Sequence, residues 1–166
     1  MAPVVRAKVW CRSVDRNVAL PMPVNAARVL FLCTGNYYRS RFAEVLFNHL
    51  AAQQGLPHVA DSAGLVQRCW ERNPGPISPH TLEALAVRGI NLELVRAPRD
   101  VNESDFALFS HVIAMKGTEH RPMVQARFAS WVNHVEYWAF DDIEDQAPAV
   151  VVPQIEVHVR KLLAAL

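Results

Sequence analysis

The chain is constrained most by an apolar run at residues 28–33 that leads directly into a helical pattern. In RVLFLC the apolar residues are continuous, as expected for a strand buried on both faces of a parallel sheet. Beyond it, apolar residues from Phe42 to Leu50 recur at helical spacing, and Gly55 lies where a helix would end. The pattern predicts a strand followed by a helix.

The rest of the chain repeats this alternation. Apolar runs predict further strands within residues 58–65, 111–115 and 134–140. Helical patterns cover residues 78–90, 102–109, 116–124 and 153–166. The first of them has Ser78 as its cap and Pro79 at the first helical position, and the last begins with Pro153. This order predicts an α/β fold of three layers, with a four-stranded parallel sheet and helices on both faces.

Residues 28–166 are predicted to form one domain, preceded by an extension at residues 1–27. The extension alternates loosely, which predicts a short extra strand and then a proline-containing linker. Its basic residues interrupt any signal-peptide pattern, and no run approaches the roughly 20 apolar residues that span a membrane. The 17 Lys and Arg nearly balance the 16 Asp and Glu, so no nucleic-acid-binding surface is expected. These features predict a cytoplasmic protein.

The three cysteines are Cys11, Cys33 and Cys69. Their number is odd and none forms a C-x-x-C pair, which argues against both a disulfide framework and a zinc site. Cys11 and Cys69 are expected to be small buried apolar side chains. Cys33 differs from them because it ends a predicted strand immediately before a predicted helix.

The segment CTGNYYRS, residues 33–40, predicts an anion-binding loop. Free N–H groups at a helix N-terminus attract negative charge, and Gly35 and Asn36 tolerate the left-handed backbone that a ring of N–H groups needs. Arg39 supplies a planar fork for two phosphate oxygens. The alternative is an ordinary surface arginine. No Walker loop is present, because the chain has no G-x-x-x-x-G-K-[ST].

In such a loop Cys33 would act as a nucleophile. The field that binds an anion would also stabilise its thiolate, and Ser40 could donate its hydroxyl to the sulfur. The alternative is a cysteine that is merely buried in the strand. Ligand sites in open parallel sheets lie beyond the carboxyl ends of the strands. Residues 61–64 and 140–145 follow two other strands, so we expect them to lie near the loop.

Several motifs together resemble the low-molecular-weight protein tyrosine phosphatases. That family has an apolar strand running into C-x-G-N-x-C-R-S and a helix containing A-E, which match CTGNYYRS and residues 43–44. DSAG, ISPHTLEALAVRGI and APRDVNESDFALFSHVIAM are similar to later family segments. The resemblance covers residues 28–166 and implies the flavodoxin-like, low-molecular-weight phosphatase fold.

The resemblance implies hydrolysis through a cysteinyl phosphate. Cys33 would attack phosphorus, Arg39 and the loop amides would hold the phosphate oxygens, and an aspartate would protonate the leaving group. No metal or organic cofactor is implied. The partner would be a phosphorylated protein or small aryl phosphate, and phosphate or sulfate could occupy the loop. The residues implied to bind phosphate or support the loop are Thr34, Gly35, Asn36, Tyr37, Tyr38, Ser40 and Ser62.

The general acid is to be chosen among Asp141, Asp142 and Asp145. The family has this aspartate directly before a proline, and no Asp-Pro occurs here. YWAFDD resembles W-G-F-D-D-P of the thioredoxin-coupled arsenate reductases, in which the second aspartate precedes the proline. Asp142 is therefore preferred and Asp141 is the reserve, while solvated turn carboxylates are the alternative.

Two tyrosines depart from the family pattern. Tyr38 occupies the place of a second cysteine that can trap the oxidised nucleophile as a disulfide, so this local rescue is predicted to be absent. Tyr37 occupies a pocket-wall position where threonine accompanies a preference for phosphoarginine. A tyrosine there would narrow the pocket and offer a face to a flat ring, which favours an aryl phosphate.

Two other functions stay open on the same residues. Arsenate reduction usually needs two further cysteines after the strand at 111–115, and AMKGTEHRPM contains none, although an external thiol could replace them. A non-catalytic module could use the loop only to bind an anion. The presence of Cys33, Arg39 and a candidate acid favours the phosphatase.

Overall fold

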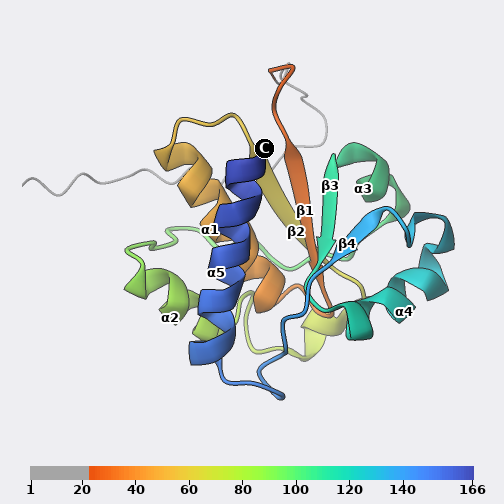
Figure 1. Ribbon diagram of the computed structural model, residues 1–166. Helices are drawn as coiled ribbons and strands as arrows, with labels where there is room; N and C mark the ends of the chain where they lie inside the picture. Colours follow the sequence, from red (N-terminus) through yellow and green to blue (C-terminus); the bar gives the residue numbers. More distant parts are fainter. Residues whose placement is uncertain (1–22) are drawn as a thin grey trace, which may run out of the picture.

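The four predicted strands form one parallel sheet (Figure 1). The computed structural model describes residues 23–166, and the strand predicted earlier in the chain lies outside them. The strand order is β2-β1-β3-β4, and all three pairings are parallel. The strands are β1 (Arg28–Cys33), β2 (Val59–Gly64), β3 (His111–Ala114) and β4 (Val135–Tyr137).

Strand β1 is buried on both faces, as its continuous apolar run predicted. Alternate side chains point to opposite sides of a strand. Val29, Phe31 and Cys33 belong to one hydrophobic cluster, while Leu30 and Leu32 belong to the other. The central position of β1 therefore explains why its sequence does not alternate between apolar and polar residues.

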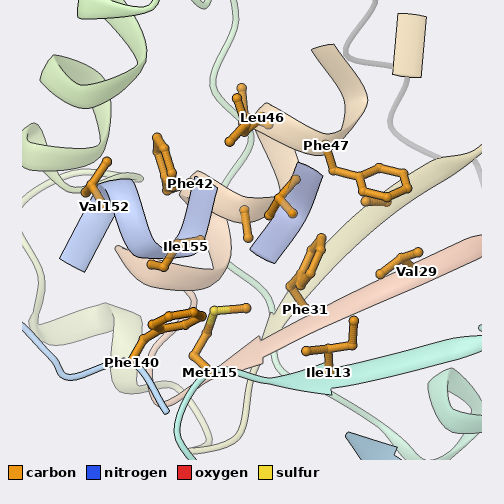
Figure 2. Close-up of a cluster of buried hydrophobic side chains, with 14 of the residues drawn as sticks. Val29, Phe31, Phe42, Leu46, Phe47, Ile113, Met115, Phe140, Val152 and Ile155 are labelled. Carbon is orange, nitrogen blue, oxygen red and sulfur yellow. The ribbon is translucent and has the colours of Figure 1, made fainter. Parts of the chain in front are cut away.

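Helices cover both faces of the sheet, which confirms the three-layer prediction (Figure 1). Helices α1 (Arg39–Gln53), α2 (Pro79–Val87) and α5 (Pro148–Ala165) contribute to the cluster on one face. Figure 2 shows Phe42 of α1 and Ile155 of α5 over Phe31 and Ile113 of the sheet. On the other face lie α3 (Glu103–Leu108) and α4 (Gly117–Arg127), with short 3-10 helices at Cys69–Arg72 and Ala129–Trp131 elsewhere in the chain.

Helix starts follow the sequence signals, with one correction. Ser78 accepts a hydrogen bond from the His80 N–H and Pro79 is the first residue of α2, as predicted. The predicted start of the last helix at Pro153 is wrong, because α5 begins at Pro148. Pro153 lies inside the helix and cannot donate a backbone hydrogen bond there. Burial of the preceding Val151 and Val152 against the core offsets this loss.

The strand ends meet at one edge of the sheet. Cys33 is level with Gly64 across the β1–β2 pairing, and Leu32 is level with Ala114 across the β1–β3 pairing. Loops that leave these strands are therefore brought together at that edge. None of the helices within residues 23–166 is both long enough and apolar enough to cross a membrane.

Replacing Phe31 with alanine should lower the free energy of unfolding by about 3–5 kcal/mol, because it removes a large ring from the middle of the core. The ring is fully buried and lies 6.1 Å from Phe47 and 5.8 Å from Trp138, centroid to centroid. Urea unfolding measures the loss. Val150→Ala on α5 is the control, since that valine is 45% exposed. Equal losses in the two variants would contradict this assignment of the core.

Candidate active site

The carboxyl edge of the sheet borders a cavity of about 560 Å³. Its lining comes from the loop between β1 and α1, from residues 69–80 and from residues 142–145, with Glu119 of α4. The first and third segments were predicted to be neighbours. Residues 69–80 were not predicted to reach this edge, because no sequence pattern placed the long connection before α2.

Cys33 and Ser40 are in contact at this edge. The Cys33 Sγ lies 2.9 Å from the Ser40 Oγ, and both side chains are buried. Ser40 Oγ also accepts a hydrogen bond of 3.1 Å from Asn36 Nδ2. That bond occupies a lone pair of the oxygen and leaves the hydroxyl hydrogen for the sulfur. The arrangement therefore suits a hydrogen bond from Ser40 to a Cys33 thiolate.

The backbone of the loop is tightly constrained. Asn36 has φ 53°, a left-handed conformation that asparagine adopts more easily than most residues. Gly35, which would tolerate the same conformation, does not adopt it. Its missing side chain instead makes room, because a Cβ there would lie 3.3 Å from the Cys69 Sγ. A Cβ on Gly64 would lie 3.1 Å from the Thr34 carbonyl oxygen, so β2 needs glycine where the loop crosses it.

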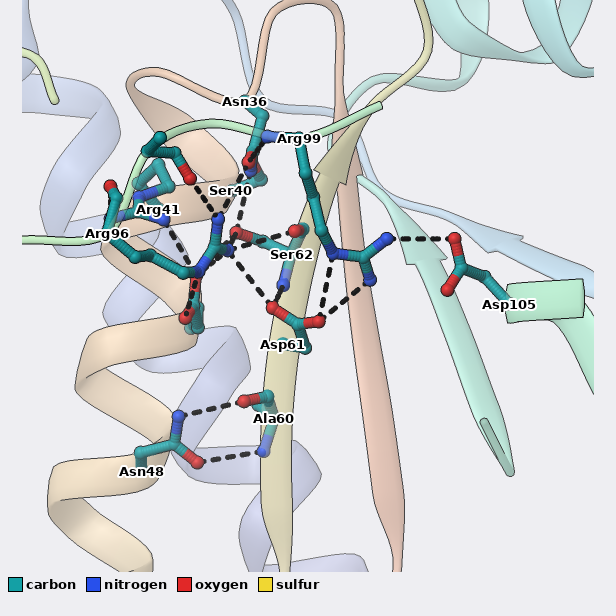
Figure 3. A network of polar contacts seen from close by, with 12 residues as sticks. Asn36, Ser40, Arg41, Asn48, Ala60, Asp61, Ser62, Arg96, Arg99 and Asp105 are labelled. Carbon is teal, nitrogen blue, oxygen red and sulfur yellow. Dashed lines mark hydrogen bonds and ion pairs between the residues drawn. The ribbon is translucent and has the colours of Figure 1, made fainter. Parts of the chain in front are cut away.

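The Asn36 side chain uses both ends of its amide to hold the loop (Figure 3). Its Nδ2 donates to Ser62 Oγ at 2.7 Å as well as to Ser40. Its Oδ1 accepts from the Arg99 backbone N–H at 3.1 Å and from Arg96 Nη1 at 3.2 Å. A buried amide with all these bonds formed can keep only one orientation. Asn36 and Ser62, predicted to support the loop, lie in contact.

Two arginines connect this amide to the rest of the fold (Figure 3). Arg96 Nη2 donates to Glu44 Oε2 at 2.7 Å and to Asp61 Oδ1 at 3.0 Å. Arg99 Nη2 donates to the other oxygen of Asp61 at 2.7 Å, and its Nη1 donates to Asp105 at 2.8 Å. The network joins α1, β2 and α3 behind the loop. Asp61 lies in the segment 61–64 that was expected near the loop, whereas no role in the site was predicted for Glu44, Arg96, Arg99 or Asp105.

Arg39 is 1% exposed and its guanidinium is surrounded by acceptors. Nη1 donates to Glu119 Oε2 at 3.0 Å and to the Phe140 carbonyl at 2.9 Å. Nη2 donates to Glu119 Oε1 at 3.1 Å and to Asp142 Oδ2 at 2.5 Å. Burial disfavours the charge, but these carboxylates and Cys33 outweigh it and raise the pKa of Arg39. The Nε is buried and has no hydrogen-bond partner among the described residues.

Glu119 lines the cavity and contacts Arg39, and the sequence analysis missed it. It accepts the Thr34 hydroxyl in addition to both Arg39 nitrogens. The His120 Nδ1 accepts the Lys116 N–H at 3.0 Å, so in the neutral ring Nε2 carries the hydrogen. That Nε2 lies 3.2 Å from Glu119 Oε1. Burial raises the pKa of Glu119, but bonds from His120, Arg39 and Thr34 overcome it and hold that pKa far below its ordinary value.

The neighbours Asp141 and Asp142 point to different partners. Asp142 contacts Arg39 and lines the cavity. Asp141 instead pairs with Lys116 Nζ at 2.7 Å, and the same ammonium contacts Asp145 at 3.1 Å. Of the three candidate acids, only Asp142 contacts the arginine beside Cys33 in the described structure. Its other oxygen, Oδ1, accepts the Ile143 N–H at 2.7 Å.

The two tyrosines of the loop have different environments. Tyr37 is partly exposed, lines the cavity and donates its hydroxyl to the Pro74 carbonyl at 2.9 Å. Tyr38 is 5% exposed and its hydroxyl has no partner in the described structure. Burial, followed by the charge of Asp142, raises the pKa of Tyr38 to about 12. The prediction that Cys69 is buried is wrong, since it is partly exposed and lines the cavity.

Residues 28–166 match the family of low molecular weight phosphotyrosine protein phosphatases. The chain belongs to this family. It is 44% identical over 92 residues to the low molecular weight protein-tyrosine-phosphatase YfkJ of Bacillus subtilis. The aligned segment covers 52% of this chain and 54% of YfkJ. This chain is 32% identical over 107 residues to a protein-arginine-phosphatase of the same organism, covering 64% and 67%.

Solved structures agree with the family assignment. The crystal structure of YfkJ from Bacillus subtilis superposes with a TM-score of 0.73 at 28% identity, covering 84% of this chain and 94% of that one. The low molecular weight protein tyrosine phosphatase from T. tengcongensis gives 0.71 at 25% identity, with 84% and 99% covered. The family fold thus extends over the 84% of the chain that superposes, although the sequence alignment spans about half the length of YfkJ.

Glu119→Gln should lower the free energy of unfolding by about 2 kcal/mol near neutral pH, because Arg39 would lose one of its two charged partners and keep only Asp142. This loss of stability is smaller than the loss expected on breaking a fully buried ion pair, because a quarter of the Glu119 side chain is exposed. The low folded-state pKa makes this contribution complete above the ordinary pKa of 4.5 and smaller as the pH falls below it.

Denaturant unfolding at about pH 6 and about pH 3 tests this expectation. The difference between wild type and Glu119→Gln should shrink at the lower pH. Glu83→Gln, at an exposed position of α2, is the matched control and should leave stability nearly unchanged at both. A Glu119→Gln loss that does not depend on pH would show that the charge of Glu119 is not what stabilises Arg39.

Proposed function

We propose that this protein hydrolyses phosphate monoesters through a cysteinyl phosphate on Cys33. The main support is an anion site built around that thiol. Arg39 Nε is a buried donor without a partner, and the described backbone hydrogen bonds use none of the N–H groups of residues 35–38. A phosphate would satisfy these donors above the sulfur. The proposed catalytic domain is residues 28–166.

The first step would transfer the phosphoryl group to sulfur. The Cys33 thiolate attacks phosphorus, an S–P bond forms, and the bond to the leaving oxygen breaks. Asp142, in its protonated form, gives its proton to that oxygen. Arg39 would hold the phosphate through Nε and Nη2, while Nη1 stays with Glu119 and the Phe140 carbonyl. A phosphate at Nη2 competes with Asp142 and so releases this carboxyl for the leaving group.

The second step would return the enzyme to its starting state. Ionised Asp142 takes a proton from water, the oxygen attacks phosphorus, and the S–P bond breaks to give phosphate and the Cys33 thiolate. No metal enters either step. In the described part of the chain, no three His, Cys, Asp or Glu side chains are grouped so that they could hold a metal ion. Cys33 must be a free thiol, which fits a reducing compartment such as the cytoplasm.

The proposed substrate is an aryl phosphate, either phosphotyrosine in a protein or a small phenyl phosphate. Tyr37 and Tyr38 both line the cavity, so a flat ring would meet aromatic side chains on entering. The Tyr37 hydroxyl is tied to the Pro74 carbonyl, which keeps the tyrosine in the wall of the cavity. Relatives of both specificities exist, named as a tyrosine phosphatase and an arginine phosphatase. Tyr37 and Tyr38 favour the specificity of a tyrosine phosphatase, because a phosphotyrosine ring could pack against them.

Purified protein should hydrolyse para-nitrophenyl phosphate under reducing conditions, and Cys33→Ser should lower kcat by about 10³-fold or more. Phosphotyrosine should react faster than phosphoarginine. Cys11→Ser, which lies outside the residues that match the family, is the control and should retain activity. An inactive wild type that binds phosphate would support the anion-binding module, and thiol-dependent reduction of arsenate without hydrolysis would support the reductase.

Asp142→Asn should lower kcat/KM by about 10²-fold or more for phenyl phosphate and much less for para-nitrophenyl phosphate, because a poor leaving group depends on protonation. Asp141→Asn is the matched control, since Asp141 contacts Lys116 and not Arg39. It should stay within about threefold of wild type on both substrates. The assignment is wrong if the Asp142 variant keeps its rate on phenyl phosphate, or if Asp141→Asn has the larger effect.

A further inference from the structure

The Tyr38 hydroxyl is a buried donor without a hydrogen-bond partner in the described structure. The other two tyrosines of the chain each have one: Tyr37 donates to the Pro74 carbonyl and Tyr137 to the Val132 carbonyl. Buried hydroxyl groups are normally satisfied, and an exception in a folded protein requires an explanation. For Tyr38 the explanation should lie in the cavity that it lines.

The surroundings of Tyr38 point to the acid loop. Its ring belongs to the hydrophobic cluster that also contains Phe140, and Phe140 precedes Asp142 by two residues. Both Tyr38 and Asp142 line the cavity. Burial, and after it the charge of Asp142, raises the pKa of Tyr38, which agrees with the position of both side chains in the wall of one cavity. At that pKa of about 12, Tyr38 keeps its proton at neutral pH and can donate it.

Asp142 will need a new partner when a substrate binds. One of its oxygens contacts Arg39 Nη2 at 2.5 Å and the other accepts the Ile143 N–H at 2.7 Å. A phosphate on Arg39 removes the first contact. Lys116 is not free to replace it, because its ammonium is already paired with Asp141 and Asp145. The Asp142 oxygen released from Arg39 and the Tyr38 hydroxyl, which has no partner in the described structure, then line the same cavity.

We propose that Tyr38 is a positioning residue for Asp142, to which its hydroxyl donates a hydrogen bond once phosphate has displaced Asp142 from Arg39. This inference rests on the proposed function. A bond from Tyr38 to Oδ2 leaves Oδ1 to face the leaving group and later the attacking water, because Oδ1 has a second lone pair beside the one that the Ile143 N–H uses. The bond also stabilises the ionised carboxyl in the substrate complex, and its loss removes that stabilisation.

Other titratable and charged groups line the same cavity and set the background of any pH profile. They are Cys33, Tyr37, Arg39, Cys69, His80, Glu119, Glu144 and Asp145. None of them changes in Tyr38→Phe, which removes only the hydroxyl and keeps the buried ring. A shift in the pH profile of kcat in this variant would therefore result from the loss of the Tyr38 hydroxyl.

The test compares wild type with Tyr38→Phe on phenyl and para-nitrophenyl phosphate. We expect kcat/KM to fall about tenfold on phenyl phosphate and much less on the other substrate. In the pH profile of kcat, which reports the substrate complex, the limb controlled by Asp142 should move to higher pH. The corresponding limb of kcat/KM, which reports the free enzyme, should not move, because Arg39 holds Asp142 there.

A double-mutant cycle separates positioning from a structural effect. In an Asp142→Asn background, Tyr38→Phe should cause no further loss, because Tyr38 acts through that carboxyl. Tyr137→Phe, on a tyrosine outside the cavity, is the control and should match wild type. Unchanged leaving-group dependence in Tyr38→Phe, or equal losses with and without Asp142, would overturn the inference. If activity survives in Cys33→Ser, the proposed function itself fails, and the two failures are thus distinguishable.

Discussion

The buried guanidinium of Arg39 is the interaction on which the rest of the site depends. A charge that is 1% exposed is costly unless acceptors surround it. Glu119 of α4, the Phe140 carbonyl and Asp142 supply them, so this one side chain joins the start of α1 to two other segments. The N-terminus of α1 can therefore be placed accurately against the strand that carries Cys33.

The two sides of the loop differ in how readily their bonds can be exchanged. On the β2 side, Asn36 has partners at both ends of its amide, and the arginines behind it are paired with carboxylates. These bonds hold a left-handed residue in place. On the other side, Arg39 has an Nε without a partner among residues 23–166 and a contact to Asp142 that phosphate would replace in the proposed mechanism. A fixed side and an exchangeable side suit the proposed mechanism, in which the loop binds an anion and Asp142 is then released to act as the acid.

Sequence patterns predicted the sheet, its helical layers and the loop because each of these depends on local order. Continuous apolar runs indicated strands, and CTGNYYRS placed Cys33, Asn36 and Ser40 within a few residues of one another. The partners of the loop were harder to predict. Glu119 follows the third strand, whose carboxyl end lies at the same edge of the sheet. A Glu-His pair in a polar helix is, however, equally typical of a solvent-exposed surface, so the sequence did not mark it as part of the site.

Other errors have a similar origin. Arg96 and Arg99 lie in a segment between α2 and α3 with no helical or strand periodicity, so nothing in the sequence placed them behind Asn36. The same holds for Cys69, which a 3-10 helix brings to the cavity. Helix α5 was predicted to start late because Pro153 was assigned to the first turn, whereas Pro148 occupies it. The positions of Arg96, Arg99 and Cys69 depend on contacts with residues that are distant in the sequence.

The choice between Asp141 and Asp142 shows what the structure adds. Adjacent aspartates in a polar turn are equivalent by composition, and the family's marker, a following proline, is absent here. Lys116 distinguishes them by pairing with Asp141 and with Asp145, on either side of Asp142. Two of the three carboxylates are thereby held by one ammonium, and the middle one is left to Arg39. A lysine just after β3 thus separates the aspartate that contacts Arg39 from the two candidates beside it.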